Sequence, residues 1–295
     1  MSIEKLINLG VTVTLIETMV TIGLGVTFAQ VAGVARNGRL VAKATIANYI
    51  LVPAATVALL MLFHPHPMVA VGILLVAVCP GAPYGPPFTA MAKGNVPMAV
   101  GLMVIFAGSS AIIAPLLLSI LLRQVLGNEN GGIRFDIVNI VSTLLFSQLI
   151  PLCIGLFLRQ RRPGLAQRLK KPAARLATLL NVVMNGVILV VEFQHLRHIK
   201  MTGFVGMLLL PIAFIAAGWL LGGPGASNRK AMALSTGIRN GQVGLIIAIG
   251  SFAGTPAVTS AVAFAIFQTI VLAVAAAAWG RLSHDDAGAV QRVAV

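Results

Sequence analysis

Charged residues, and acidic ones above all, are scarce in this sequence. Asp, Glu, Lys and Arg make up 9% of the 295 residues, and only seven of these are acidic. A soluble domain would have about 25% charged residues, so a soluble globular protein is excluded. The hydrophobic fraction of 58% and the mean hydropathy of +0.97 indicate an integral membrane protein instead.

Residues that carry catalysis or bind metals are also few. The two cysteines, Cys79 and Cys153, lie in apolar segments, where packing is expected rather than a disulfide framework. His64 and His66 have no acidic or cysteine neighbour that would complete a metal site. No nucleophile lies near a base in the pattern that covalent catalysis needs. We therefore expect no enzyme, no transition-metal site and no organic cofactor.

Long apolar runs occupy almost the whole sequence. About 20 helical residues cross a hydrocarbon core of about 30 Å, which predicts an all-α integral membrane protein with about nine transmembrane helices and no separate soluble domain. The first run contains Glu17 and lacks a clear cleavage site, so we expect a retained span rather than a signal peptide. The predicted spans are 11–34, 41–63, 67–92, 96–123, 136–158, 173–195, 202–221, 228–252 and 256–280.

Basic residues are concentrated in the loops that follow the odd-numbered spans. The formal net charge is +14, but these charges do not gather on one face, so nucleic acid is not an expected partner. The positive-inside rule places the N-terminus outside and the C-terminus in the cytoplasm of a multi-pass protein of the cell inner (plasma) membrane. The most basic stretch, 159–175, is predicted to be a cytoplasmic loop that fixes this topology. A lipid-binding or partner-binding patch is the alternative.

A proline-rich stretch, residues 79–95, interrupts the third span. Pro80, Pro83, Pro86 and Pro87 have no backbone donor, and each clashes with the carbonyl four residues earlier, so a regular helix cannot pass through. Backbone groups freed at membrane depth are tolerated only beside other protein or a water-filled cavity. The stretch therefore predicts a broken helix, with which secondary transporters commonly build a site.

The eighth span, 228–252, repeats this pattern. Gly237, Gly241 and Gly244 weaken its helix, and a long unbroken span follows it, as after the first break. Matching spans one to four with spans six to nine gives an odd offset, so the second copy is inverted in the membrane and span five is left unpaired. Inverted repeats whose broken helices meet near the membrane midplane are a transporter pattern.

Arg239 is the charge that lies deepest in a span. It follows the basic pair Arg229 and Lys230 by about ten residues, which places it roughly 15 Å from that end at 1.5 Å per helical residue. A buried guanidinium is costly and normally faces an aqueous cavity or a partner. Two compatible roles are open: binding a ligand, and capping carbonyls that the proline-rich break sets free.

Uncharged polar side chains accompany this arginine. Asn240 and Gln242 flank the second break and offer amide groups either to a ligand or to another helix. Asn181 and Asn185 are four residues apart and share one helix face. The residues predicted to bind substrate are Pro83, Tyr84, Thr89, Ser109, Ser110, Arg239, Asn240 and Gln242.

Glu17 is the only acidic residue well inside a span. It is a candidate for proton coupling or for pairing with an arginine. Alternatively, its side chain reaches the outer interface and has no role in transport.

Four motifs occur in an order and spacing that are typical of one family. They are GLGVT (23–27), ANYILVPA (47–54), CPG (79–81) with AKGN (92–95), and GIRNGQV (237–243). On these motifs the chain resembles the bile acid:sodium symporter family, including its bacterial members, over nearly its whole length.

The resemblance implies a core domain from spans two to four and seven to nine, and a panel domain from spans one, five and six. It also implies alternating access by movement of core against panel, and an organic-anion substrate such as a bile-acid-like steroid acid or a small carboxylate. Nine spans match family members that lack the first of ten helices. The implied segments are 1–35 (panel), 36–125 (core, first repeat), 126–200 (panel), 201–281 (core, second repeat) and 282–295 (cytoplasmic tail).

The sequence departs from the family pattern where the resemblance places sodium ligands. Gly85 and Pro86 stand in place of a Ser-Asn pair. Ser235 stands in place of a Glu and Arg239 in place of a Gln, while Asn48 takes the position of another Gln. We hypothesise that the Arg239 guanidinium is a built-in cation that substitutes for sodium and faces the substrate carboxylate. The ion-coupling candidates are Asn48, Ser235, Glu17 and Arg239.

Sodium coupling is then expected to be absent or much weakened, and transport to be facilitated, exchange-driven or proton-coupled through Glu17. The predicted function is secondary transport of organic anions. The alternatives are a channel-like uniporter and a membrane binding or sensor protein without transport. The expected partners are a small organic anion and the lipid bilayer.

Overall fold

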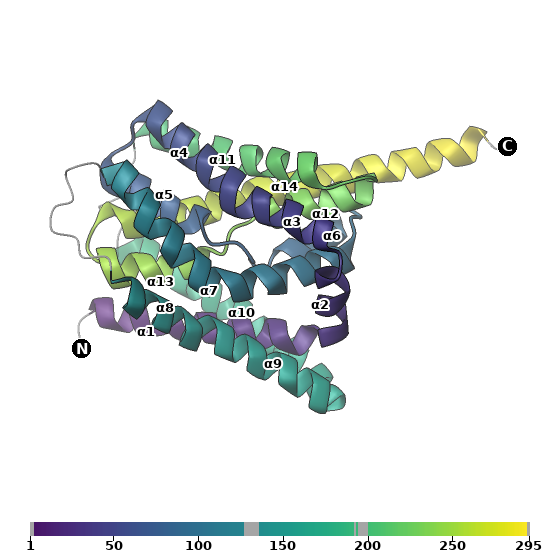
Figure 1. The fold of residues 1–295 in the computed structure, drawn as a ribbon, viewed down its shortest axis with the longest axis horizontal. Helices are drawn as coiled ribbons and strands as arrows, with labels where there is room; N and C mark the ends of the chain where they lie inside the picture. Colours follow the sequence, from purple (N-terminus) through teal and green to yellow (C-terminus); the bar gives the residue numbers. More distant parts are fainter. Residues whose placement is uncertain (1–2, 127–135, 192, 194–199, 294–295) are drawn as a thin grey trace.

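The computed structural model describes residues 3–126, 136–191, 193 and 200–293. Every regular element in these residues is helical, which confirms the all-α class (Figure 1). The end of the sixth predicted span, beyond residue 193, lies outside the described residues.

Seven helices or continuous helix series in the described residues are long and apolar enough to cross a membrane. Two of these spans each consist of two α-helices joined in line through a π-helical turn, and each such series counts as one span. The seven are α1 (Ile3–Gly25); α3 (Gly38–Ile46) with η1 (Ala47–Leu51) and α4 (Val52–Phe63); α7 (Val96–Leu126); α8 (Ile137–Leu144) with η2 (Leu145–Leu149) and α9 (Ile150–Arg161); α10 (Pro163–Val191); α11 (Met201–Leu221); and α14 (Pro256–Val293).

The two remaining predicted spans are both interrupted helices. The first consists of α5 (Pro67–Ala77) and α6 (Gly85–Met91), and the second of α12 (Ala226–Gly237) and α13 (Gly241–Phe252). The proline-rich break is therefore confirmed. Gly244 lies within α13 and does not interrupt it; a Cβ at this position would lie 2.8 Å from the Val76 Cα of α5. This glycine serves close helix packing.

Gly81 shapes the first break. Its φ of 86° lies in the region that favours glycine. A Cβ at this position would also lie 2.6 Å from the Cα of Ala107 in α7. The chain at this break therefore needs the glycine for two reasons, its backbone conformation and its contact with α7.

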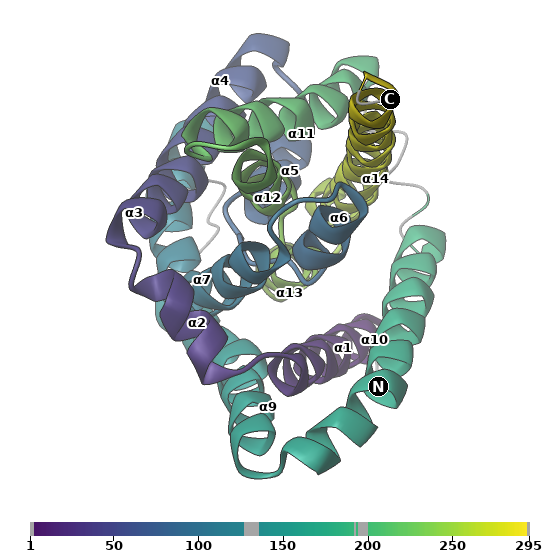
Figure 2. The ribbon, with the colours of Figure 1, turned by 90° about the vertical axis from the view of Figure 1, so that its right-hand side faces the viewer.

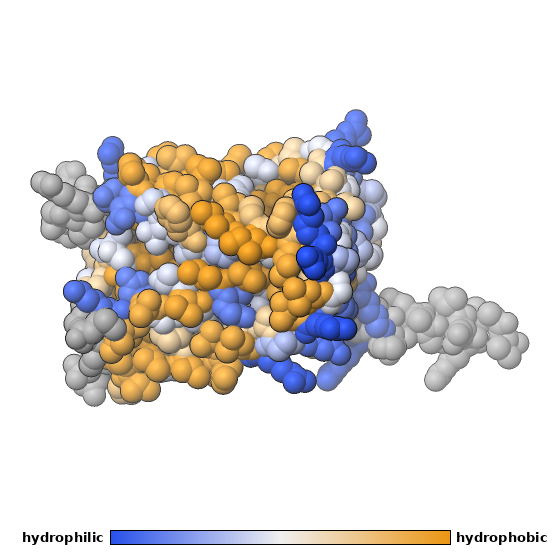
Figure 3. Space-filling model, turned by 90° about the horizontal axis from the view of Figure 1, so that it is seen from below, coloured by the Kyte–Doolittle hydropathy of each residue, from blue (hydrophilic) through white to orange (hydrophobic). Residues whose placement is uncertain are grey.

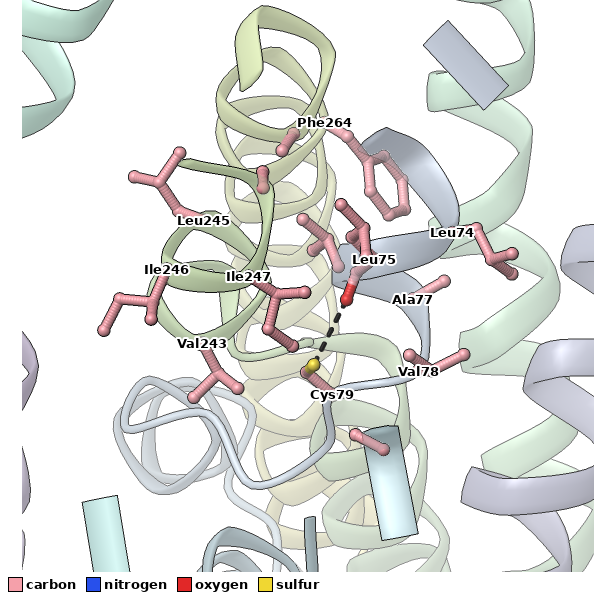
Figure 4. Close-up of a cluster of buried hydrophobic side chains, with 14 of the residues drawn as sticks. Leu74, Leu75, Ala77, Val78, Cys79, Val243, Leu245, Ile246, Ile247 and Phe264 are labelled. Atoms are coloured by element: carbon pink, nitrogen blue, oxygen red, sulfur yellow. Dashed lines mark hydrogen bonds between the residues drawn. The ribbon is translucent and has the colours of Figure 1, made fainter. Parts of the chain in front are cut away.

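The two breaks meet inside the protein. The backbone N–H of Asn240, in the second break, donates to the carbonyl of Cys79, in the first, over 2.7 Å. Figure 4 shows the apolar cluster around this point: Leu75 of α5 and Ile247 of α13 lie next to Cys79, and Phe264 of α14 belongs to the same cluster. The Cys79 thiol is buried and donates to the Leu75 carbonyl over 3.1 Å, in agreement with its predicted packing role.

Helices α1, α9 and α10 lie together on one side, and α4, α5, α11, α12, α13 and α14 gather on the other (Figure 2). Glycines bring α1 and α9 into close contact, because a Cβ at Gly23 would lie 2.7 Å from the Cα of Gly155. Small residues at such positions let membrane helices approach closely. Figure 3 shows an apolar surface that ends in hydrophilic residues at both ends of the molecule.

Two predicted boundaries are wrong. The first span does not continue to residue 34, because α1 ends at Gly25 and a separate helix, α2 (Phe28–Ala35), follows. Thr27 and Gln30 form a capping box that starts this second helix. The stretch 159–175 is not a loop either: α9 continues to Arg161, and α10 begins at Pro163, a favourable first position for a helix.

Candidate functional site

A cavity of about 430 Å³ lies beside the meeting point of the two breaks. The breaks, α13 and α14 form one wall, and α1 and α10 form the opposite one. Most of the lining is apolar. The polar residues that line it are Thr14, Tyr84, Asn181, Asn185, Arg239, Asn240, Gln242, Gln268 and Thr269.

Arg239 lies in the second break, where its backbone is unwound. Ile238 ends α12 with a ψ of 126°, which is extended. The side chain of Gln268, on α14, then replaces the missing helical hydrogen bonds of Arg239. Gln268 accepts from the Arg239 N–H over 2.9 Å and donates to the Arg239 carbonyl over 2.9 Å. This clamp holds a non-helical residue inside the protein with both backbone groups satisfied.

The guanidinium of Arg239 is buried, with 1% of the residue exposed. Its Nη1 donates to Asn48 Oδ1 over 2.7 Å and to the carbonyl of Thr236 over 2.9 Å. Its Cζ lies 6.0 Å from the centre of the Phe214 ring, within range of a cation–π contact. All of these partners are neutral, and no acidic side chain in the described part of the chain is bonded to this arginine.

Asn48 reaches the arginine from η1. Such π-helical turns frequently occur at functional sites, and this one carries Asn48 and Tyr49 inward. Asn48 donates to the Ala44 carbonyl over 2.8 Å while its oxygen accepts from Arg239. The carbonyl that Arg239 caps belongs to Thr236, in the second break. Of the two roles left open for Arg239, the capping of carbonyls of the proline-rich break is therefore wrong, because the capped carbonyl belongs to the second break.

Several buried polar atoms at the second break have no hydrogen-bond partner in the structure. They are Nε and Nη2 of Arg239, Nδ2 of Asn240, Oε1 of Gln242 and Oγ of Ser235. Buried polar groups are normally paired, so each exception needs an explanation. The three nitrogens are all donors. A binding site for an acceptor, above all an anionic one, explains them together.

The arrangement of the free donors on Arg239 is specific. Nη1 is occupied, whereas Nε and Nη2 share one edge of the planar guanidinium. Two parallel N–H groups on one edge match the two oxygens of a carboxylate. The site therefore offers a fork for an oxyanion, beside a cavity with apolar walls.

A network of amides crosses the cavity from α13 to α1 and α10. Gln242 Nε2 donates to Asn181 Oδ1 over 2.7 Å and to Thr18 Oγ1 over 3.4 Å. Asn185 donates to the Asn181 carbonyl over 2.7 Å. Gln242 therefore bonds across two helix groups, and its other side-chain atom, Oε1, stays unpaired.

The structure brings five of the eight predicted substrate-binding residues to the cavity and three elsewhere. Pro83, Tyr84, Arg239, Asn240 and Gln242 line it. Thr89 donates to the Gly85 carbonyl of its own helix, Ser109 bonds the hydroxyl of Tyr49, and Ser110 donates to the Ala107 carbonyl and accepts from Gln148.

The ion-coupling candidates also separate into two groups. Asn48 contacts Arg239, and Ser235 lies one turn earlier on α12, where a Cβ at Gly85 would lie 3.7 Å from its hydroxyl oxygen. Glu17 is on α1, accepts from the Thr21 hydroxyl over 2.9 Å and is not part of the cavity lining. The structure thus does not bring Glu17 to Arg239.

Gln268 is the functional residue that our reading of the sequence missed. Its signal was present, since it is one of few polar residues in the apolar run of α14. Its role depends on the side chain facing the second break from a helix that follows about 30 residues later, and helical spacing within α14 carries no such information.

An all-helical membrane protein whose two interrupted helices meet beside a mainly apolar cavity with several polar side chains has the architecture of a membrane transporter. The model of the Sodium Bile acid symporter family matches residues 12–216, which is more than half of the chain. The protein belongs to this family.

Curated relatives are distant but cover most of the chain. It is 24% identical over 245 residues to the "Uncharacterized sodium-dependent transporter YocS" of Bacillus subtilis, covering 80% of this chain and 72% of that protein. It is 23% identical over 239 residues to the "Probable sodium/metabolite cotransporter BASS2, chloroplastic" of Oryza sativa, covering 78% of this chain but only 54% of that protein. The "Hepatic sodium/bile acid cotransporter" of Rattus norvegicus is 22% identical over 249 residues, with coverage of 81% and 67%.

Proposed function

We propose that the protein is a secondary transporter of organic anions that works by alternating access. The observation that carries the proposal is the buried edge of Arg239, whose Nε and Nη2 have no partner beside the cavity. A carboxylate would fill this edge with two charge-assisted hydrogen bonds. The apolar walls suit a hydrophobic body, as in a bile-acid-like steroid acid, or the short chain of a small carboxylate.

The proposed architecture has nine spans in inverted repeats, with the two interrupted helices as spans three and eight. The bond between Asn240 and Cys79 supports it, because it joins the two breaks directly. The domain boundaries proposed from the sequence follow the same division. In that scheme 36–125 and 201–281 form the core, 1–35 and 126–200 form the panel, and 282–295 is a cytoplasmic tail.

Movement of the core against the panel would expose the cavity to each side of the membrane in turn. In support of this scheme, the cavity lies between α1 and α10 on one side and α13 and α14 on the other. Few polar bonds cross it, chiefly those of Gln242. The proposed setting is the cell inner membrane, with the N-terminus outside and the C-terminus in the cytoplasm, because the basic residues favour that orientation.

We further propose that sodium does not bind where the breaks meet, although the names of the family and of its relatives refer to sodium. Transporters of this general kind bind Na⁺ through oxygens at unwound helix segments. Here Asn48 Oδ1 and the Thr236 carbonyl accept from Arg239, and the Cys79 carbonyl accepts from Asn240. The guanidinium of Arg239, fixed in hydrogen-bond contact with the first two of these oxygens, repels a second cation.

The sodium proposal is tested by thermal stability. An ion that binds only the folded state stabilises it by RT ln(1 + [L]/Kd). The melting temperature of the purified protein is expected to be equal in sodium and in potassium or choline at matched ionic strength. A saturable, sodium-specific rise would show a surviving site. The variant Ser235→Glu, Arg239→Gln, Gly85→Ser, Pro86→Asn is expected to gain a sodium response, and no gain would count against the proposed role of Arg239.

The transport proposal is tested by uptake into proteoliposomes. Labelled steroid acids and small carboxylates are expected to enter saturably, and Arg239→Gln is expected to reduce uptake by about tenfold or more because one charge-assisted fork is lost. Arg36→Gln, an exposed arginine outside the cavity lining, is the matched control. Flux that does not saturate would indicate a channel-like pore, and binding without flux would indicate a sensor.

A further inference from the structure

The charge of Arg239 cannot leave the protein. In a symporter the coupling cation enters with the substrate and departs with it, so the empty carrier returns without that charge. The guanidinium of Arg239 is instead covalently fixed where the two breaks meet, with 1% of the residue exposed. The carrier therefore has this positive charge at its centre in every step of its cycle.

The surroundings of Arg239 do not neutralise it. Its bonded partners are an amide oxygen of Asn48 and the backbone carbonyl of Thr236, and its Cζ lies 6.0 Å from the centre of the Phe214 ring. These groups orient the guanidinium but supply no full negative charge. Glu17, the acidic residue within a span, is bonded to Thr21 on α1.

An unpaired buried charge is unfavourable, and the penalty depends on the access of water. In a conformation in which water reaches Arg239, that water screens the charge. When the carrier passes through a closed conformation, that water is excluded. An anion on the free edge of Arg239 removes the penalty, because it pairs the charge and fills the donors Nε, Nη2 and Asn240 Nδ2.

We propose that this carrier is an exchanger: it reorients only with an organic anion bound, so that uptake of one anion is coupled to the exit of another. The inference rests on the proposed transport function and adds that this transport is an exchange of one anion for another. Arg239 takes the part of a resident cation, and the bound pair of guanidinium and monocarboxylate crosses the closed conformation as a neutral unit.

The experiment measures uptake of a labelled monocarboxylate into proteoliposomes that contain the full-length protein. One set of vesicles holds the same unlabelled carboxylate inside, and the other holds an impermeant buffer anion. We expect uptake to be at least about tenfold faster with internal carboxylate, because the unpaired charge slows return of the empty carrier. We also expect no change when sodium is replaced by potassium, and no change with a valinomycin-set potential, because one-for-one exchange moves no net charge.

Two variants connect this behaviour to the charge. Arg239→Lys keeps the cation and is expected to keep the preference for internal carboxylate, even with a weaker affinity. Arg239→Gln removes the cation and is expected to bring the ratio of the two rates close to one. The wild-type ratio is the primary result and does not depend on the folding of either variant.

The outcomes are distinct. Equal uptake into both sets of wild-type vesicles, sensitive to the potential, would overturn the exchange mechanism and leave the transport function standing. Uptake into both sets that needs external sodium would also overturn it, in favour of symport. Saturable binding without uptake in either set would overturn the transport function itself.

Discussion

The two helix breaks that meet at the cavity are held open in different ways. The first, residues 78–84, contains two prolines and Gly81, so its covalent chemistry prevents a continuous helix. The second, residues 238–240, has no proline. It stays unwound because the Gln268 side chain bonds both backbone groups of Arg239 and Asn240 bonds across to Cys79.

From this difference we interpret the first break as a scaffold and the second break as the binding site. In the part of the chain that the structure describes, seven buried side-chain polar atoms have no partner; five of them belong to residues in or beside the second break, and none to the first. We interpret the proline-rich break as a rigid support against which the second break packs. The second break contains buried side chains with unpaired polar atoms that a ligand can bond, and side-chain hydrogen bonds hold it unwound.

The largest effect is expected from a substitution in the first break. Gly81→Ala forces a side chain into a positive-φ conformation and against the Cα of Ala107. Strain and overlap together are expected to cost about 4 kcal/mol or more, in the range of severe core substitutions. The measurement is the yield of monodisperse protein in detergent and its melting temperature.

Gly33→Ala is the matched control for that substitution. Gly33 lies in α2, and a Cβ there meets no atom within 4 Å. This change is expected to be neutral or to stabilise by about 0.5–1 kcal/mol, as for glycine to alanine in a helix. A Gly81→Ala protein as stable as this control would contradict the rigid-scaffold interpretation of the first break.

The second prediction concerns Gln268, whose side chain bonds the backbone of Arg239 in the second break. Gln268→Ala leaves the N–H and carbonyl of Arg239 without partners in a buried position. Each of the two unsatisfied groups costs about 1–3 kcal/mol, so we expect a loss of about 2–6 kcal/mol in unfolding free energy and weaker substrate binding. Gln124→Ala, an exposed position on α7, is the control. Equal stability of the two variants would mean that the break does not depend on Gln268.

Much of the fold could be predicted from the sequence because its causes are local. Apolar length predicted the seven long spans, and Pro80 and Pro83 predicted the first break. The errors have a different origin. A capping box at Thr27 ends the first span early, and the basic stretch 159–175 is helical because charged side chains do not prevent a helix outside the apolar core.

The site was predicted less completely because it is built from contacts between distant segments. Arg239 was identified from its depth alone, since a charge within a span is rare. Its bonds to Asn48 and Gln268 join residues 191 and 29 positions apart. Ser109 and Ser110 were assigned to the cavity by type, whereas helix rotation turns them toward Tyr49 and Gln148.

The smallest expected effect concerns the amide bond across the cavity, which links the second break to the helices opposite. Gln242 and Asn181 lie on α13 and α10, and their 2.7 Å bond is partly buried. Removing a hydrogen bond of this kind costs about 0.5–1.5 kcal/mol. We expect Gln242→Ala and Asn181→Ala each to lower stability by about that much and to be coupled by a similar amount in a double-mutant cycle. If the bond breaks whenever the carrier reorients, Gln242→Ala should also alter the exchange rate by a few fold. An unchanged exchange rate, together with additive stability losses in the double mutant, would show that the two helix groups are not coupled through this bond.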